Sequence, residues 1–167
     1  MSATIDYNKL VIQLASSDWQ VRDATRKILE QGGKATLSAM KQAYAHPNWR
    51  VRRECLAFMD HFADQTCVKL MAKALKDPNE SVRRSALHSL HCDRCKPAPL
   101  TFDMVPELLD VAQHDRSPRI RRNALGLLQN KKPDARIVPV MQAILAVEKD
   151  ERLRTHAQIV LERQRAR

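Results

Sequence analysis

The sequence predicts an all-α protein of the α-solenoid class, built from about five antiparallel helix pairs. Three observations lead to this prediction. A short pattern recurs at intervals of 30, 31, 38 and 33 residues, the apolar residues after it follow a helical period, and only three glycines occur in 167 residues. A single helix pair cannot bury its apolar stripe alone, whereas stacked pairs can, so a period of this length indicates a helical repeat protein.

The recurring pattern is an aliphatic residue followed by arginine, and it marks the second helix of each pair. Apolar or small residues four and eight positions later complete one helix face. Three positions before the pattern lies a residue whose side-chain oxygen can accept a hydrogen bond from the first helical turn. The patterns are Val21-Arg22, Val51-Arg52, Val82-Arg83, Ile120-Arg121 and Leu153-Arg154. The capping residues are Asp18, Asn48, Asn79, Ser117 and Asp150.

Another amphipathic segment precedes each second helix and is predicted to be the first helix of its pair. These segments span residues 7–15, 35–45, 64–76, 105–114 and 138–147. We expect the earliest second helix to end at Gln31, with Gly32 as its C-terminal stop. The chain then forms a single domain over residues 1–167. Its repeats lie at about 4–32, 33–62, 63–92, 101–131 and 134–164, with an insertion at 91–100.

Two strings within this pattern resemble a known repeat family. Residues 77–87 (DPNESVRRSAL) and 105–109 (VPELL) look like HEAT repeats of the short, phycobilisome-lyase-like type. The resemblance covers nearly the whole chain and implies a scaffold or binding module whose second helices form the concave surface. A few members of that family are chromophore lyases, so a lyase or isomerase activity is the enzymatic alternative. The insertion after residue 90 departs from the family pattern.

Composition and missing motifs narrow the function further. The chain has a net charge of +10, three glycines and four cysteines. So few glycines exclude the common phosphate-binding loops, and neither a zinc-hydrolase helix nor a nucleophile elbow is present. No apolar run is long enough to span a membrane, and the cysteines do not form a disulfide framework. We therefore expect a non-catalytic protein of the reducing cytoplasm, while the residues indicate nothing about its oligomeric state.

The arginine directly after each aliphatic residue is predicted to be structural. This position lies about 100° round the helix from the buried residue, at the margin of the apolar stripe. Such an arginine can lay its stem on the core and pair its head with an aspartate or a carbonyl of the next repeat. The HEAT resemblance implies the same inter-repeat role. The five residues are Arg22, Arg52, Arg83, Arg121 and Arg154.

Arginines one position before or two after the aliphatic residue point away from the core. They are Arg50, Arg53, Arg84, Arg119, Arg122 and Arg152. We expect them to form a basic face that binds an acidic protein or peptide, because guanidinium groups match carboxylate geometry. Nucleic acid is the competing partner, and six phosphate contacts would give a salt slope of about −5. An ordinary solvated charged face is the plainest alternative.

The two tryptophans carry a weaker signal. Trp19 and Trp49 each directly follow a capping residue. A tryptophan at this position usually fills the gap between adjacent turns, and stacking on nucleic-acid bases is the alternative.

The insertion contains a Cys-x-x-Cys turn, Cys92 and Cys95, just after His88 and His91. These four residues could bind zinc. The alternatives are an ordinary loop and a redox or disulfide pair, and no other cofactor is expected.

Overall fold

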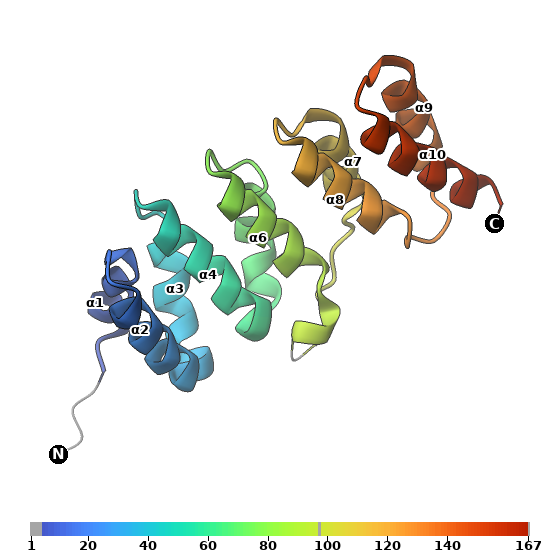
Figure 1. Ribbon diagram of the computed structural model, residues 1–167. Helices are drawn as coiled ribbons and strands as arrows, with labels where there is room; N and C mark the ends of the chain where they lie inside the picture. The colour runs from blue at the N-terminus through green and yellow to red at the C-terminus, as the bar shows by residue number, and fades with distance from the viewer. Residues whose placement is uncertain (1–4, 97, 167) are drawn as a thin grey trace. The chain divides into compact units, whose positions relative to one another are not determined.

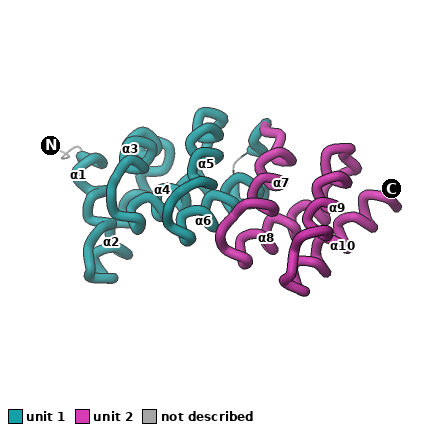
Figure 2. The backbone as a smooth tube through the Cα atoms, turned by 90° about the horizontal axis from the view of Figure 1, so that it is seen from above, with its two compact units in different colours: residues 1–101 teal, residues 102–167 magenta. Residues whose placement is uncertain are grey.

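The computed structural model describes residues 5–96 and 98–166, and the regular structure within these ranges is entirely helical. The predicted all-α fold of helix pairs is therefore confirmed. The chain divides into two compact units, residues 1–101 (unit 1) and 102–167 (unit 2), which Figure 2 colours teal and magenta. Among the described residues, no helix is both long enough and apolar enough to cross a membrane.

Unit 1 contains three helix pairs, and its first helices are partly 3₁₀ in character. Its α-helices are α1 (Tyr7–Val11), α2 (Trp19–Gly32), α3 (Leu37–Ala43), α4 (Trp49–Phe62), α5 (Val68–Ala74) and α6 (Glu80–His91). Its 3₁₀ turns are Ile12–Ala15, Gly33–Thr36, Gln65–Cys67 and Asp93–Cys95. The second helices α4 and α6 lie side by side (Figure 1).

Unit 2 contains two helix pairs. Its helices are α7 (Val105–His114), α8 (Pro118–Leu128), α9 (Ile137–Val147) and α10 (Glu151–Arg165). The second helices α8 and α10 pack against each other. Pro118 is the first residue of α8, where its missing N–H leaves no intrahelical hydrogen bond unmade.

The predicted helix face forms the core of each unit. In α4 the residues of this face, Val51, Cys55 and Met59, are all 0% exposed, and the equivalent residues of α6, α8 and α10 are buried too. Burying each large aliphatic side chain contributes roughly 1.5–3 kcal/mol. The first repeat departs from the pattern because Val21 is 38% exposed.

The stop of α2 is Gly33 rather than Gly32, which corrects the prediction. Gly33 has φ +52°, a conformation that L side chains rarely adopt, and its N–H donates to the carbonyl of Glu30. Gly32 is still helical. A Cβ atom there would lie 2.6 Å from Tyr7 Oη, so Gly32 serves the close approach of α1.

Candidate functional site

The turn before each second helix is held by a recurring side-chain hydrogen bond that sequence reasoning missed. The residue five positions before the aliphatic residue accepts a hydrogen bond from the backbone N–H of the capping residue, at 2.7–3.1 Å. The acceptors are Ser16, His46, Asp77, Asp115 and Glu148. The sequence feature that could have predicted this hydrogen bond is a polar side chain with an acceptor atom five positions before the aliphatic residue in every repeat.

Four of the predicted capping residues also use their side chains as expected. Asp18, Asn48, Asn79 and Asp150 accept from the backbone N–H two residues later. Ser117 occupies the capping position without such a hydrogen bond among the described residues. The following residue there is proline, so the first turn of α8 has one amide fewer to satisfy.

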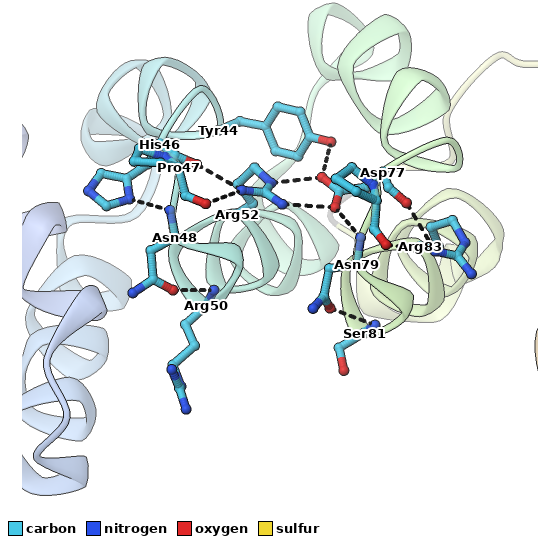
Figure 3. Close-up of polar contacts among 11 residues, drawn as sticks. Tyr44, His46, Pro47, Asn48, Arg50, Arg52, Asp77, Asn79, Ser81 and Arg83 are labelled. Carbon is cyan, nitrogen blue, oxygen red and sulfur yellow. Dashed lines mark hydrogen bonds and ion pairs between the residues drawn. The ribbon is translucent and has the colours of Figure 1, made fainter.

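The five arginines after the aliphatic residues are here called the inner arginines, and four of them anchor these turns through backbone carbonyls. Arg52 Nη1 donates to the carbonyls of His46 and Pro47, at 2.9 and 2.7 Å (Figure 3). Arg22, Arg83 and Arg154 also donate to backbone carbonyls that precede their own helices. The carbonyls therefore belong to the arginine's own repeat rather than to the next one, whereas the predicted pairing with an aspartate of the next repeat is made by Arg52.

Carboxylates of the following repeat bind two of the inner arginines. Arg52 donates two hydrogen bonds to Asp77, from Nε to Oδ2 at 2.7 Å and from Nη2 to Oδ1 at 2.9 Å (Figure 3). Tyr44 Oη donates to the same carboxylate at 3.1 Å. In unit 2, Arg121 Nη2 lies 3.1 Å from Glu148 Oε2. Each pair ties one second helix to the turn that begins the next.

The cluster around Asp77 shifts two pKa values. Burial raises the pKa of the Asp77 carboxyl, but hydrogen bonds from Arg52 and from the Asn79 amide outweigh it and hold that pKa below its ordinary value. Burial and the adjacent Asp77 charge raise the pKa of Tyr44 well above its ordinary value. At neutral pH the cluster is therefore a carboxylate held by a guanidinium and a neutral phenol.

The six arginines predicted to face outward, here called the outer arginines, differ in how free they are. Arg50, Arg84, Arg119 and Arg152 are exposed. Arg53 is half-buried and pairs with Glu54, a buried carboxylate that also accepts from Arg26 Nε at 3.0 Å. Arg122 is half-buried, and its Nη1 lies 3.9 Å from Asp150 Oδ2. Unit 1 carries three of the set and unit 2 the other three; a single basic face remains a prediction.

The two tryptophans occupy different environments. Trp19 is 65% exposed, so the prediction that it fills a gap between turns was wrong. Trp49 is half-buried, with the guanidinium of Arg50 4.9 Å and that of Arg53 5.5 Å from its ring centre. Both distances fall in the range of cation–π attraction. Trp49 thus holds two outer arginines together at the start of α4.

The Cys-x-x-Cys turn belongs to a second polar cluster in unit 1. Ligand atoms of Asp60, His88, Cys92 and Cys95 all lie within 4.8 Å of one another. His91, which was predicted as a possible ligand, lies outside this group. Sequence reasoning missed Asp60, whose signal was a charged residue directly after the buried Phe58 and Met59.

Electrostatics keep the Cys95 thiol of this cluster protonated. A hydrogen bond with Cys92, together with burial and the nearby Asp60 carboxylate, raises the pKa of Cys95 to about 11. Reactive redox cysteines instead have lowered pKa values.

Comparison with known proteins agrees with this architecture. The HEAT repeats family profile matches residues 7–90, half of the chain. The mouse (Mus musculus) AP-3 complex subunit beta-1 is 25% identical over 143 residues, which cover 70% of this chain but only 13% of the mouse protein. The solved complex of CpcE and CpcF of phycocyanin lyase from Nostoc sp. PCC7120 is similar in fold. It has a TM-score of 0.65 and 17% identity, covering 92% of this chain and 96% of that one. The chain belongs to the HEAT-repeat family.

Proposed function

We propose that the protein is a non-catalytic scaffold that binds an acidic protein or peptide through its outer arginines. The observation that carries this proposal is the contrast between the two arginine sets. The inner arginines are occupied by backbone carbonyls and carboxylates. The exposed outer arginines Arg50, Arg84, Arg119 and Arg152 have no ion-pair partner within the described parts of the chain.

Three of these exposed arginines sit where the helix itself disfavours a cation. Arg50, Arg119 and Arg152 are the second residues of α4, α8 and α10. The N-terminal end of a helix carries a partial positive charge, and a cation there is unfavourable by about 0.3–1 kcal/mol. The first turns of α4 and α8 contain no acidic residue. A bound carboxylate would relieve this repulsion and pair with the guanidinium.

The distribution of acids favours a peptide over a nucleic acid duplex. Glu54 lies beside Arg53, and Asp150 and Glu151 adjoin Arg152. A duplex presents closely and evenly spaced phosphates, some of which would meet these carboxylates. An acidic peptide can place its carboxylates opposite the arginines only. HEAT repeats are a protein-binding fold, and both similar proteins are named as parts of protein complexes.

The proposal is tested by fluorescence anisotropy with two labelled probes, a Glu- and Asp-rich peptide and a random-sequence duplex. Arg50→Glu combined with Arg84→Glu should weaken peptide binding by about ten-fold or more, since each reversal replaces attraction with repulsion. The matched control is Lys69→Glu with Lys73→Glu, which makes the same change of charge at exposed positions of α5. This control should bind within about two-fold of the unmodified protein.

Three results would contradict the proposal. Duplex binding tighter than peptide binding, with a salt slope steeper than about −3, would favour nucleic acid. Equal losses in the arginine variant and the lysine control would show that net charge alone drives binding. A visible absorbance band from a bound tetrapyrrole would favour the chromophore-lyase alternative.

A further inference from the structure

We propose that Asp60, His88, Cys92 and Cys95 form a zinc-binding site in unit 1. The four ligand atoms lie within 4.8 Å of one another. Cys92 Sγ is 2.7 Å from Cys95 Sγ, and His88 Nε2 is 3.0 Å from Asp60 Oδ2. A tetrahedral zinc with Zn–S bonds of about 2.3 Å separates its ligand atoms by roughly 3.3–3.8 Å. To admit the ion, the two sulfurs need to move apart by about 1 Å and the His88 and Asp60 ligand atoms by about 0.3 Å.

Three elements bring these side chains together. His88 lies in the last turn of α6, and Cys92 directly follows that helix, one helical turn further on. The 3₁₀ turn at Asp93–Cys95 folds the chain back so that Cys95 meets Cys92. Asp60 comes from the last turn of α4, which packs against α6. A ligand set divided between two repeats in this way would fasten the insertion to α4.

The burial of Asp60 is the second observation that points to an ion. Its side chain is 8% exposed, and its Oδ1 atom has no hydrogen-bond partner among the described residues. A buried carboxylate oxygen that makes no hydrogen bond loses its hydration without full replacement, and the Lys96 ammonium 3.6 Å away compensates for this only in part. A zinc ion at the centre of the cluster would coordinate this carboxylate.

Zinc binding is compatible with the formal charges at the site. Zinc with two thiolates, one carboxylate and a neutral imidazole carries a net charge of −1. The Lys96 side chain is 0% exposed, and its Nζ lies 3.6 Å from Asp60 Oδ1. Its ammonium also donates to the Cys92 carbonyl at 2.7 Å. A fully buried ammonium needs a compensating negative charge, which Asp60 supplies without zinc and which the zinc–ligand group would preserve.

The donor set selects the class of metal. Two sulfurs, one imidazole nitrogen and one carboxylate oxygen suit tetrahedral zinc, whereas magnesium and calcium require oxygen donors. Four protein ligands leave no open position for water or substrate, so the site would be structural.

The test begins with the intact protein, purified without a tag or chelator in the presence of a reductant. Mass spectrometry of the metal content should find one zinc ion per chain. After the zinc is removed, titration with Co²⁺ should produce a thiolate charge-transfer band and strong visible bands of tetrahedral cobalt. This readout does not depend on whether any variant folds. Absence of the tetrahedral spectrum would overturn the proposal, as would a Cys92–Cys95 disulfide that persists under the reductant.

Matched variants then assign the ligands. Asp60→Asn should weaken zinc binding at least ten- to hundred-fold, the range seen when even outer-sphere partners of a metal are lost. Asp93→Asn makes the same change at an exposed position of the insertion and should bind zinc normally. Cys92→Ser with Cys95→Ser should abolish the cobalt spectrum, whereas Cys67→Ala should retain it. Unaltered zinc affinity in Asp60→Asn or in the double cysteine variant would contradict the assignment.

Discussion

Two junctions between second helices can be compared, α4 with α6 in unit 1 and α8 with α10 in unit 2. Both place an arginine and a carboxylate at the same positions of the repeat, but the two pairs differ in their contacts. In unit 1 the pair Arg52–Asp77 makes two hydrogen bonds, and its side chains are 13% and 3% exposed. In unit 2 the pair Arg121–Glu148 makes one contact at 3.1 Å, with 23% and 16% exposure. Arg121 Nε is also buried without a hydrogen-bond partner within the described residues.

The way in which each carboxylate uses its two oxygens accounts for part of this difference. Asp77 presents both oxygens to Arg52 while Oδ1 also accepts from the Asn79 amide. Glu148 Oε1 accepts from the amides of Lys149 and Asp150, so only Oε2 contacts the arginine. Paired, buried hydrogen bonds between guanidinium and carboxylate are much stronger than a single exposed contact. The same offset in sequence thus produces a strong junction in unit 1 and a weaker one in unit 2.

The largest effect is expected from Asp77→Ala. Removing this carboxylate leaves the Arg52 guanidinium largely buried without its ion-pair partner and leaves the Asn79 amide without its acceptor. The free energy of unfolding should fall by about 3 kcal/mol, measured by urea denaturation of the full chain. A loss below about 1 kcal/mol would show that the pair contributes little and would remove the contrast with unit 2.

Glu148→Ala should have a smaller effect on the same measurement. Its contact with Arg121 is single and partly exposed, so the expected loss is about 1 kcal/mol. The two variants together test the comparison directly. Equal losses would mean that register alone determines the strength of a junction and that burial and the second hydrogen bond are unimportant.

The pH dependence of stability should identify Asp77 specifically. Its folded-state pKa is lowered relative to an unfolded value of about 3.9, so its stabilisation is complete above that value. The stabilisation is lost as the pH falls through the folded-state pKa. Unfolding free energies between pH 7 and pH 3 should therefore fall less steeply below about pH 4 in Asp77→Asn than in the unmodified protein. Parallel curves would exclude Asp77 as a source of acid sensitivity.

The smallest effect on stability is expected from Arg84→Ala, an exposed outer arginine of α6. Since no ion pair holds this side chain among the described residues, the unfolding free energy should change by less than about 0.5 kcal/mol. A loss comparable with that of Asp77→Ala would place Arg84 among the structural residues and would undermine the division into two sets.

Local patterns made most of the fold predictable. The capping residues and the apolar face of each second helix follow from rules that act within one helical turn, and the structure confirms these helices. Contacts made across a turn or between repeats were harder to predict from the sequence. The carbonyl partners of Arg52 depend on how the turn at His46 and Pro47 folds back, which no helical period specifies.

The candidate sites show the same division. Cys92 and Cys95 were evident from their spacing, but Asp60 joins them only because α4 packs against α6. The prediction for Trp19 was wrong because it relied on the usual packing of a tryptophan between turns, whereas this side chain is exposed. The pairing of Arg53 with Glu54 likewise depends on a carboxylate that is buried between helices, where Arg26 of α2 also reaches it.

The most direct measurement compares two arginines of α4 that are two residues apart, Arg52 and Arg50, each replaced by alanine. Unfolding free energy and affinity for the acidic peptide are measured for both variants. Arg52→Ala should lower stability by about 3 kcal/mol and leave peptide affinity of the folded protein unchanged. Arg50→Ala should weaken the peptide several-fold and leave stability within about 0.5 kcal/mol. Similar effects of the two substitutions on both quantities would contradict separate structural and binding roles for the two arginine sets.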